Sequence, residues 1–201
     1  MIALVQRHLQ AIYDVEAPDV RGYLIDAEEV RESCGDLRSA REWVLVRQDG
    51  DDVAIAVYIH PQDLDALTEH TPADAVRYAL PAWAAVTEGV SHFLLLIHRV
   101  LRDEPVSLLE LEAQAEVDKY VTARLHLGPH PALRRRLLRE ATLAPGLDAE
   151  EVERYTLAGR LADRYCGYLD RLPHTDALLA ELRRFYRLSG PNRLDRLRHA
   201  A

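Results

Sequence analysis

Lysine and cysteine are nearly absent from this sequence. Lys119 is the only lysine among 25 basic residues, and the two cysteines, Cys34 and Cys166, lie far apart in the chain. The preference for arginine is typical of a bacterial genome rich in G and C. No Cys-x-x-Cys pair exists, so the common cysteine-based metal motifs are excluded. We therefore expect two reduced thiols in a cytoplasmic protein rather than a disulfide.

Motifs that identify membrane proteins and several enzyme classes are also missing. No run of 18 apolar residues occurs, and no basic segment precedes an apolar run at the start, so we expect neither a transmembrane helix nor a secretory signal. The chain has no glycine-rich phosphate loop, no Gly-x-Ser-x-Gly elbow and no His-Glu-x-x-His zinc motif. These absences favour a cytoplasmic protein with no membrane partner and none of the commonest nucleotide, serine-hydrolase or zinc-protease sites.

The composition is sufficient for a well-buried core, because 48% of the 201 residues are hydrophobic. Charge is unevenly distributed around the net value of −8: residues 1–72 carry −9, residues 73–129 carry −3 and residues 130–201 carry +4. An acidic first third and a basic last third could dock on each other within one chain or between two copies.

The clearest strand signal lies in the acidic third. Residues 43–47 and 53–59 are both rich in β-branched and aromatic side chains, and the Asp-Gly turn within residues 48–52 separates them. Asp-Gly between two such runs predicts a β-hairpin. Because a two-stranded ribbon is marginally stable alone, we expect a third strand near Tyr23 or a helix beneath it.

The chain after residue 70 has helical periodicity. Pro105 ends one apolar helix, expected over residues 82–101, and the pair Ser107 and Glu110 forms a capping-box pattern that begins a second, over residues 108–126. A connection this short makes two helices antiparallel. We expect these two helices to form the centre of the protein.

The expected fold class is α+β. A small N-terminal antiparallel sheet, the hairpin at about residues 43–59, packs with a C-terminal bundle of about five helices. Residues 1–70 would form a small α/β subdomain and residues 71–201 the helical bundle, within one continuous globular unit.

Charged groups interrupt both central helices. Glu88 and His92 share one face of the first because they are four residues apart, and Glu112 and Glu116 share a face of the second, with Lys119 beside them. Folding the antiparallel pair about its turn places Glu88 near Lys119 and His92 near Glu116. Burying such groups on apolar helices is costly unless they are paired.

This cluster has two interpretations. In the first it is a structural ion-pair network that fixes helix register, to which a third helix adds two arginines. The members of that network are Glu88, His92, Glu116, Lys119, Arg160 and Arg164. In the second it is a divalent-metal site of an enzyme or sensor, with a free carboxylate as general base. Its ligands are Glu88, His92, Glu112 and Glu116. Ferritin-like di-iron bundles use similar residues, but with Glu-x-x-His spacing and four helices, and neither condition holds here.

Arginines and aromatic residues alternate in the basic third, a mixture that can bind phosphates and stack bases. The candidates for contact with a protein or nucleic acid are Arg134, Arg135, Arg183, Arg184 and Arg187. Since the acidic third repels nucleic acid, we interpret the chain first as a non-enzymatic cytosolic bacterial protein that binds a protein partner or self-associates, with no cofactor. A metal-dependent enzyme or sensor, and a nucleic-acid-binding accessory protein, are the alternatives.

Overall fold

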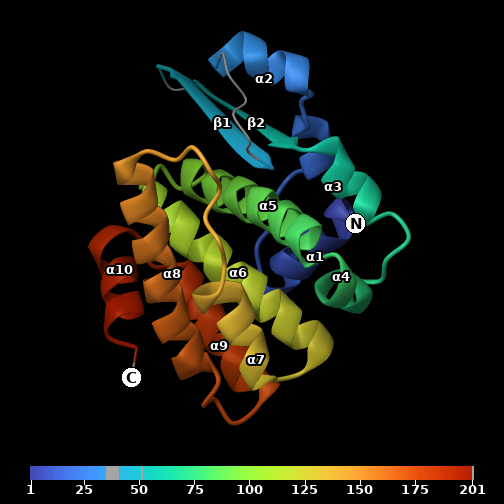
Figure 1. Cartoon of the computed structure of the whole chain (residues 1–201). Helices are drawn as coiled ribbons and strands as arrows, with labels where there is room; N and C mark the ends of the chain where they lie inside the picture. The colour runs from blue at the N-terminus through green and yellow to red at the C-terminus, as the bar shows by residue number, and fades with distance from the viewer. Residues whose placement is uncertain (35–40, 51, 201) are drawn as a thin grey trace.

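A computed structural model describes residues 1–34, 41–50 and 52–200 (Figure 1). The fold is α+β, as predicted: 66% of it is helical, and one two-stranded antiparallel sheet lies near the N-terminus. The elements in chain order are α1 (Ile2–Tyr13), the 3₁₀ helix η1 (Val20–Tyr23), α2 (Ala27–Cys34), β1 (Glu42–Asp49), β2 (Asp52–Ile59), α3 (Pro61–Ala66), α4 (Pro72–Tyr78), α5 (Leu80–Val100), α6 (Leu108–Leu127), α7 (Pro131–Arg134), the π-helical turn η2 (Arg135–Arg139), α8 (Ala149–Leu169), α9 (Thr175–Tyr186) and α10 (Gly190–Arg198).

The number of helices is higher than predicted. About five were expected after residue 70, whereas α4 to α10 all follow it in the part of the chain that the structure describes. The additional helices are short pieces such as α4 and α7, each with a proline in its first turn, where the missing N–H costs no hydrogen bond. The basic segment that contains Arg134 and Arg135 is divided between α7 and η2.

The hairpin is confirmed, and its support is a helix rather than a third strand. Glu42 pairs with Ile59 at one end of the ladder and Asp49 with Asp52 at the other. The segment near Tyr23 contributes only a single bridge, from Leu24 to Val57. The sheet packs instead on α5, which lies directly beneath it in Figure 1.

The sheet contacts α5 at a glycine, where a Cβ atom would make ordinary van der Waals contacts with the strand. A Cβ atom at Gly89 in α5 would stand 3.4 Å from Cγ1 of Ile59 and 3.5 Å from Cγ1 of Val57. Both β2 side chains are buried against the helix at this point. The start of β1, which pairs with the end of β2, is thereby brought next to α5.

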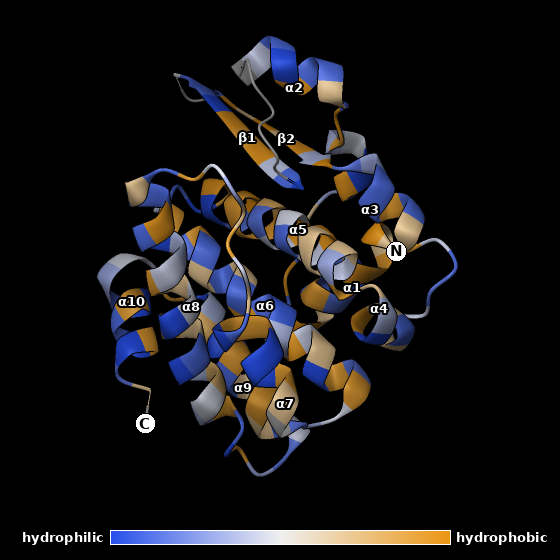
Figure 2. Cartoon of the chain, in the orientation of Figure 1, coloured by the Kyte–Doolittle hydropathy of each residue, from blue (hydrophilic) through white to orange (hydrophobic). Residues whose placement is uncertain are grey.

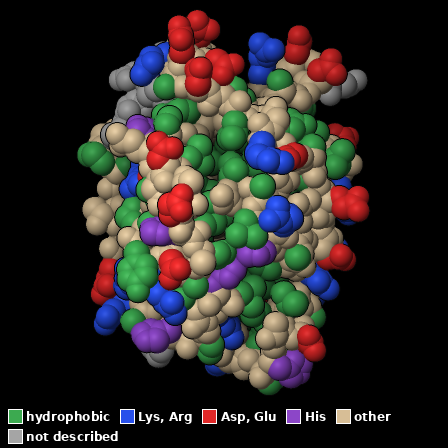
Figure 3. Space-filling model, turned by 90° about the vertical axis from the view of Figure 1, so that its right-hand side faces the viewer, with side chains coloured by type: hydrophobic (Ala, Val, Ile, Leu, Met, Phe, Trp, Pro, Cys, Tyr) green, Lys and Arg blue, Asp and Glu red, His purple; other side chains and the backbone are tan. Residues whose placement is uncertain are grey.

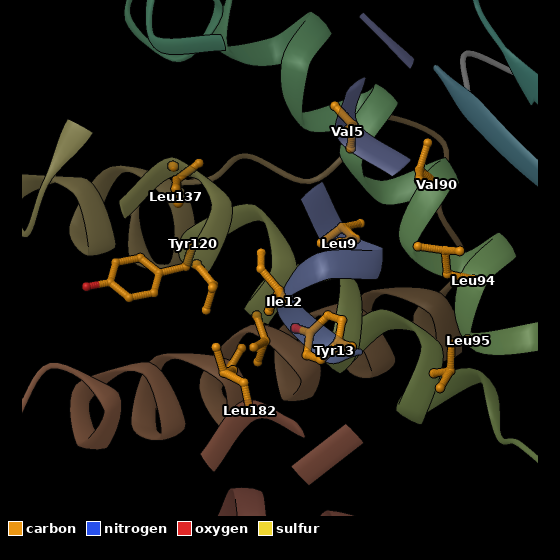
Figure 4. Packing of buried hydrophobic residues seen from close by; sticks show 14 of the residues in the cluster. Val5, Leu9, Ile12, Tyr13, Val90, Leu94, Leu95, Tyr120, Leu137 and Leu182 are labelled. Atoms are coloured by element: carbon orange, nitrogen blue, oxygen red, sulfur yellow. The ribbon is translucent and has the colours of Figure 1, made fainter. Parts of the chain in front are cut away.

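Helix α5 occupies the centre of the protein. Its 21 residues are long and apolar enough to cross a membrane, but 72% of its most apolar window is buried by other parts of the chain. Most of the side chains of α5 are buried by other elements, and much of its visible side in Figure 2 is orange or pale, as expected for a helix surrounded by others. Figure 4 shows Val90, Leu94 and Leu95 of α5 in the same core as Leu9 and Tyr13 of α1.

The ends of the long helices are closed as the sequence predicts. Ser107 and Glu110 form both hydrogen bonds of a capping box at the start of α6. Asp148 and Glu151 do the same for α8. Helices α5 and α6 are antiparallel and in contact, and α8 packs along α6, so three long helices and β1 surround the predicted cluster (Figure 1).

Candidate functional site

The charged groups of α5 and α6 meet between the two helices. The Nζ atom of Lys119 lies 3.0 Å from Oε2 of Glu88 and 2.8 Å from Oε1 of Glu116. The lysine side chain is 10% exposed, and the two glutamates 19% and 17%. The only lysine of the chain therefore pairs with two nearly buried carboxylates, and the predicted Glu88–Lys119 pair is present.

The partner of His92 differs from the prediction. Its Nε2 atom lies 3.6 Å from Oε2 of Glu112, not beside Glu116, whose carboxylate is paired with Lys119. Its Nδ1 atom lies 3.7 Å from Oε2 of Glu42, the first residue of β1. Both distances exceed that of a hydrogen bond. The imidazole thus lies between two carboxylates, one from the bundle and one from the hairpin.

The third helix contributes a different arginine from the two predicted. Nε of Arg154 lies 3.9 Å from Oε1 of Glu112. Arg160 and Arg164, further along α8, are exposed instead, and Arg164 donates to the backbone carbonyl of Arg198. Neither forms an ion pair with Glu88, Glu116 or another carboxylate that the structure describes, so the network interpretation is wrong for these two arginines.

Burial and charge act in opposite directions on this cluster. Burial alone would lower the pKa of His92, but its interactions with Glu112 and Glu42 raise that pKa well above its usual value. Burial raises the pKa of Glu42 and of Glu116. Burial alone would lower the pKa of Lys119, but the carboxylates of Glu116 and Glu88 outweigh this effect and raise it above its usual value. The protonation state of each group therefore depends on the charges of its neighbours in the cluster.

Three of these groups are placed to hold one cation. One ligand atom each of Glu88, His92 and Glu112 lies within 4.8 Å of the others. Buried Nε2 of His92 and buried Oε2 of Glu42 have no hydrogen-bond partner among the described residues. Of the four predicted ligands, Glu116 is turned to Lys119 and does not belong to the set. Glu42 was not predicted, since nothing in a strand-initial glutamate indicates which helix it will meet.

A second buried network lies beside the first and was also missed. The side chain of Asp118 accepts hydrogen bonds from Oγ of Ser91 at 2.6 Å, from Nε2 of Gln114 at 2.7 Å and from the hydroxyl of Tyr13. Gln114 in turn accepts from the guanidinium of Arg193. All five side chains are buried. They join α1, α5, α6 and α10 and satisfy one another's hydrogen bonds within the core, so we interpret them as structural.

Asp118 is expected to make stability depend on pH. Burial raises its pKa from 3.8 to about 6, despite the hydrogen bonds that lower it. Because the folded-state pKa is the higher one, its contribution is full below pH 3.8 and is lost as pH rises through about 6. A shift of about two pKa units corresponds to about 3 kcal/mol. We expect the parent to become less stable than Asp118→Asn as pH rises from 4 to 8 in urea unfolding, because asparagine resembles the protonated carboxyl and does not titrate. A constant difference would contradict the assignment.

The arginines proposed for partner binding are engaged within the chain. Arg183 donates to the carbonyls of Ala11 and Ile12 at the end of α1. Each of the other four contacts an acidic side chain: Arg134 contacts Asp163 and Asp170, Arg135 contacts Glu140, Arg184 contacts Glu181, and Arg187 contacts Asp14. Arg183 and Arg187 thus join the basic third to α1, whereas the other three contact acidic residues of the basic third itself.

The surface in Figure 3 carries acidic groups at its upper end, where α2 and the hairpin lie in Figure 1, and broken hydrophobic patches below. No extended basic face is visible in this view. The buried Glu/His/Lys cluster is the arrangement with the most distinctive chemistry among the described residues. No family model, curated protein or solved structure shows significant similarity to this chain.

Proposed function

We propose that this protein is a divalent-metal-binding protein, an enzyme or a sensor, whose metal ligands are Glu88, His92 and Glu112. The observation that carries the proposal is the buried Nε2 atom of His92, which has no hydrogen-bond donor or acceptor in the described chain and lies 3.6 Å from Oε2 of Glu112. Two ligand atoms of a tetrahedral site with metal bonds of about 2.0–2.2 Å stand roughly 3.3–3.6 Å apart. The separation is long for a hydrogen bond and close to that of two ligands of one metal.

The two ring nitrogens of His92 would have separate roles. A metal-ligating histidine almost always donates its other N–H to a carboxylate or carbonyl group, which fixes the tautomer and the ring orientation. Here Nδ1 faces Oε2 of Glu42 at 3.7 Å, while Nε2 faces Glu112. Glu42 is therefore the positioning residue, and the hairpin takes part in the site.

The charge of the cluster also favours a divalent cation. Four nearly buried carboxylates, those of Glu42, Glu88, Glu112 and Glu116, have ion pairs with only two permanent cations among the described residues, Lys119 and Arg154. A metal-ligating imidazole is neutral, so two negative charges would remain for the bound cation to balance, and unpaired buried charge is costly. Imidazole together with carboxylates suits Mn²⁺, Fe²⁺ or Zn²⁺. Three protein ligands leave a coordination position open for water or substrate.

We expect chain prepared without an affinity tag to bind one equivalent of Mn²⁺, Fe²⁺ or Zn²⁺. At about 100 times the dissociation constant the gain is about 2.7 kcal/mol, or roughly 5–10 °C in melting temperature. His92→Leu should abolish the gain because it removes a ligand. His98→Leu, on the same helix, is the matched control and should keep it. Metal analysis and thermal melting provide the measurements.

The structural alternative gives a different result. If the cluster only fixes helix register, added metal should leave the melting of the parent unchanged. His92→Leu and Glu112→Gln should then lose stability equally with and without metal. That pair of results would refute the metal centre.

A further inference from the structure

A pocket of about 350 Å³ lies next to the candidate metal centre, between α6, η2 and α8. Two of its lining residues connect it to the cluster. Glu116 is hydrogen-bonded to Lys119. The pKa of Tyr155 is raised, first by burial and then by the charges of the cluster carboxylates Glu112, Glu88 and Glu42. The pocket therefore reaches the edge of the centre from the surface of the molecule.

One of the cations that line the pocket has no acidic partner in the described part of the chain. Glu116 has Lys119 at 2.8 Å, and Asp163 has Arg139 at 3.0 Å. Arg160 also lines the pocket, and its guanidinium has no ion pair or hydrogen bond with any residue that the structure describes. Each acidic group of the wall thus has a cation beside it, and Arg160 is the lining cation that has no acidic partner among the described residues.

The rest of the wall is suited to an apolar body. Leu137, Leu138 and Leu143 come from η2 and the segment after it, and Thr156 adds a hydroxyl group on the α8 side. Apolar walls with a few placed polar groups are the usual composition of small-molecule sites, and 350 Å³ lies within their normal range.

We propose that this pocket binds a small amphipathic carboxylate, with its carboxylate on the guanidinium of Arg160 and its apolar tail against the leucines. A planar guanidinium binds a carboxylate through two parallel hydrogen bonds. The role of this ligand as a substrate or effector of the metal centre rests on the function proposed above. Its recognition by Arg160 does not require a metal.

Sodium octanoate is a suitable probe, titrated into the metal-free full-length chain by calorimetry. We expect saturable binding with one site, at least about tenfold weaker in Arg160→Met because the charge-assisted contact is lost. Arg164→Met is the matched control, since Arg164 is exposed one turn further along α8 and does not line the pocket. It should bind octanoate as the parent does, and octylamine should bind to none of the three.

Three results would overturn the inference: no octanoate binding in the millimolar range, equal binding by the Arg160→Met variant, or octylamine binding as tight as that of octanoate. Because the titration is done without metal, its outcome is independent of the metal analysis of His92→Leu. Failure of one proposal can therefore be told from failure of the other.

Discussion

Replacing Lys119 with methionine is expected to lower the free energy of unfolding by about 3–5 kcal/mol, the usual cost of leaving a buried charge without its partner. The ammonium lies 3.0 Å and 2.8 Å from the carboxylates of Glu88 and Glu116, and methionine fills similar space without charge. Such a loss is a large part of the 5–15 kcal/mol that typically stabilises a domain. Urea unfolding in the presence of a chelator measures it without a contribution from metal.

The exposed pair of Arg135 and Glu140 provides the control for Lys119→Met. Its atoms are also 3.0 Å apart, but the side chains are 61% and 54% exposed, so Arg135→Met should cost less than about 1 kcal/mol. If the Lys119→Met protein is too unstable to purify, the double variant Lys119→Met/Glu116→Gln removes one of the two unpaired charges and should recover part of the loss. Equal small losses in both single variants would show that water, not Lys119, solvates the carboxylates.

Replacing Arg193 with methionine should also lower the free energy of unfolding by about 3–5 kcal/mol, in this case because buried backbone carbonyl groups lose their hydrogen-bond donor. Its guanidinium is fully buried and donates to the carbonyls of Phe185, Tyr186 and Leu188, which end α9. It also lies over the ring of Phe185, 4.4 Å from the centroid. Burial lowers its pKa to about 10, so it is still charged at neutral pH. Without it, carbonyl groups that are shielded from water lose a donor.

Local unfolding distinguishes this role of Arg193 from general destabilisation. Amide hydrogen exchange should show that protection is lost first in α10 and at the end of α9, because Arg193 connects these helices. Arg198→Met, on the same helix, is the control: Arg198 is 47% exposed, its contact with Asp195 is at 3.3 Å, and its loss should be small. Similar exchange in both variants would be evidence against the proposed connection.

The parts of the fold that depend on neighbouring residues could be predicted from the sequence. The Asp-Gly hairpin and the capping boxes at Ser107 and Asp148 are all present, since each signal lies within a few residues. The Glu88–Lys119 pair was also correct, because the short turn between α5 and α6 restricts how far the two helices can slide.

The parts that depend on packing between distant elements could not be predicted. Helical spacing alone does not determine which acidic side chain of α6 turns toward His92, and the structure places Glu112 there instead of Glu116. Glu42 enters the site only because β2 packs on α5 at Gly89. The rotation of α8 selects Arg154 and turns Arg160 outward. Each miss is a rotation or translation of an element that was itself predicted correctly.

The contact between Arg183 and the end of α1 has a consequence for how the protein is made. The two hydrogen bonds join residues 171 and 172 positions apart. At about 5–20 residues per second, translation from Ile12 to Arg183 takes roughly 10–35 s. Throughout that time α1 lacks the partner that closes its last turn, and Leu9 and Tyr13, fully buried in the finished protein, cannot yet be covered by the C-terminal helices. The rate of translation therefore sets the shortest time for which these side chains wait for that part of the core.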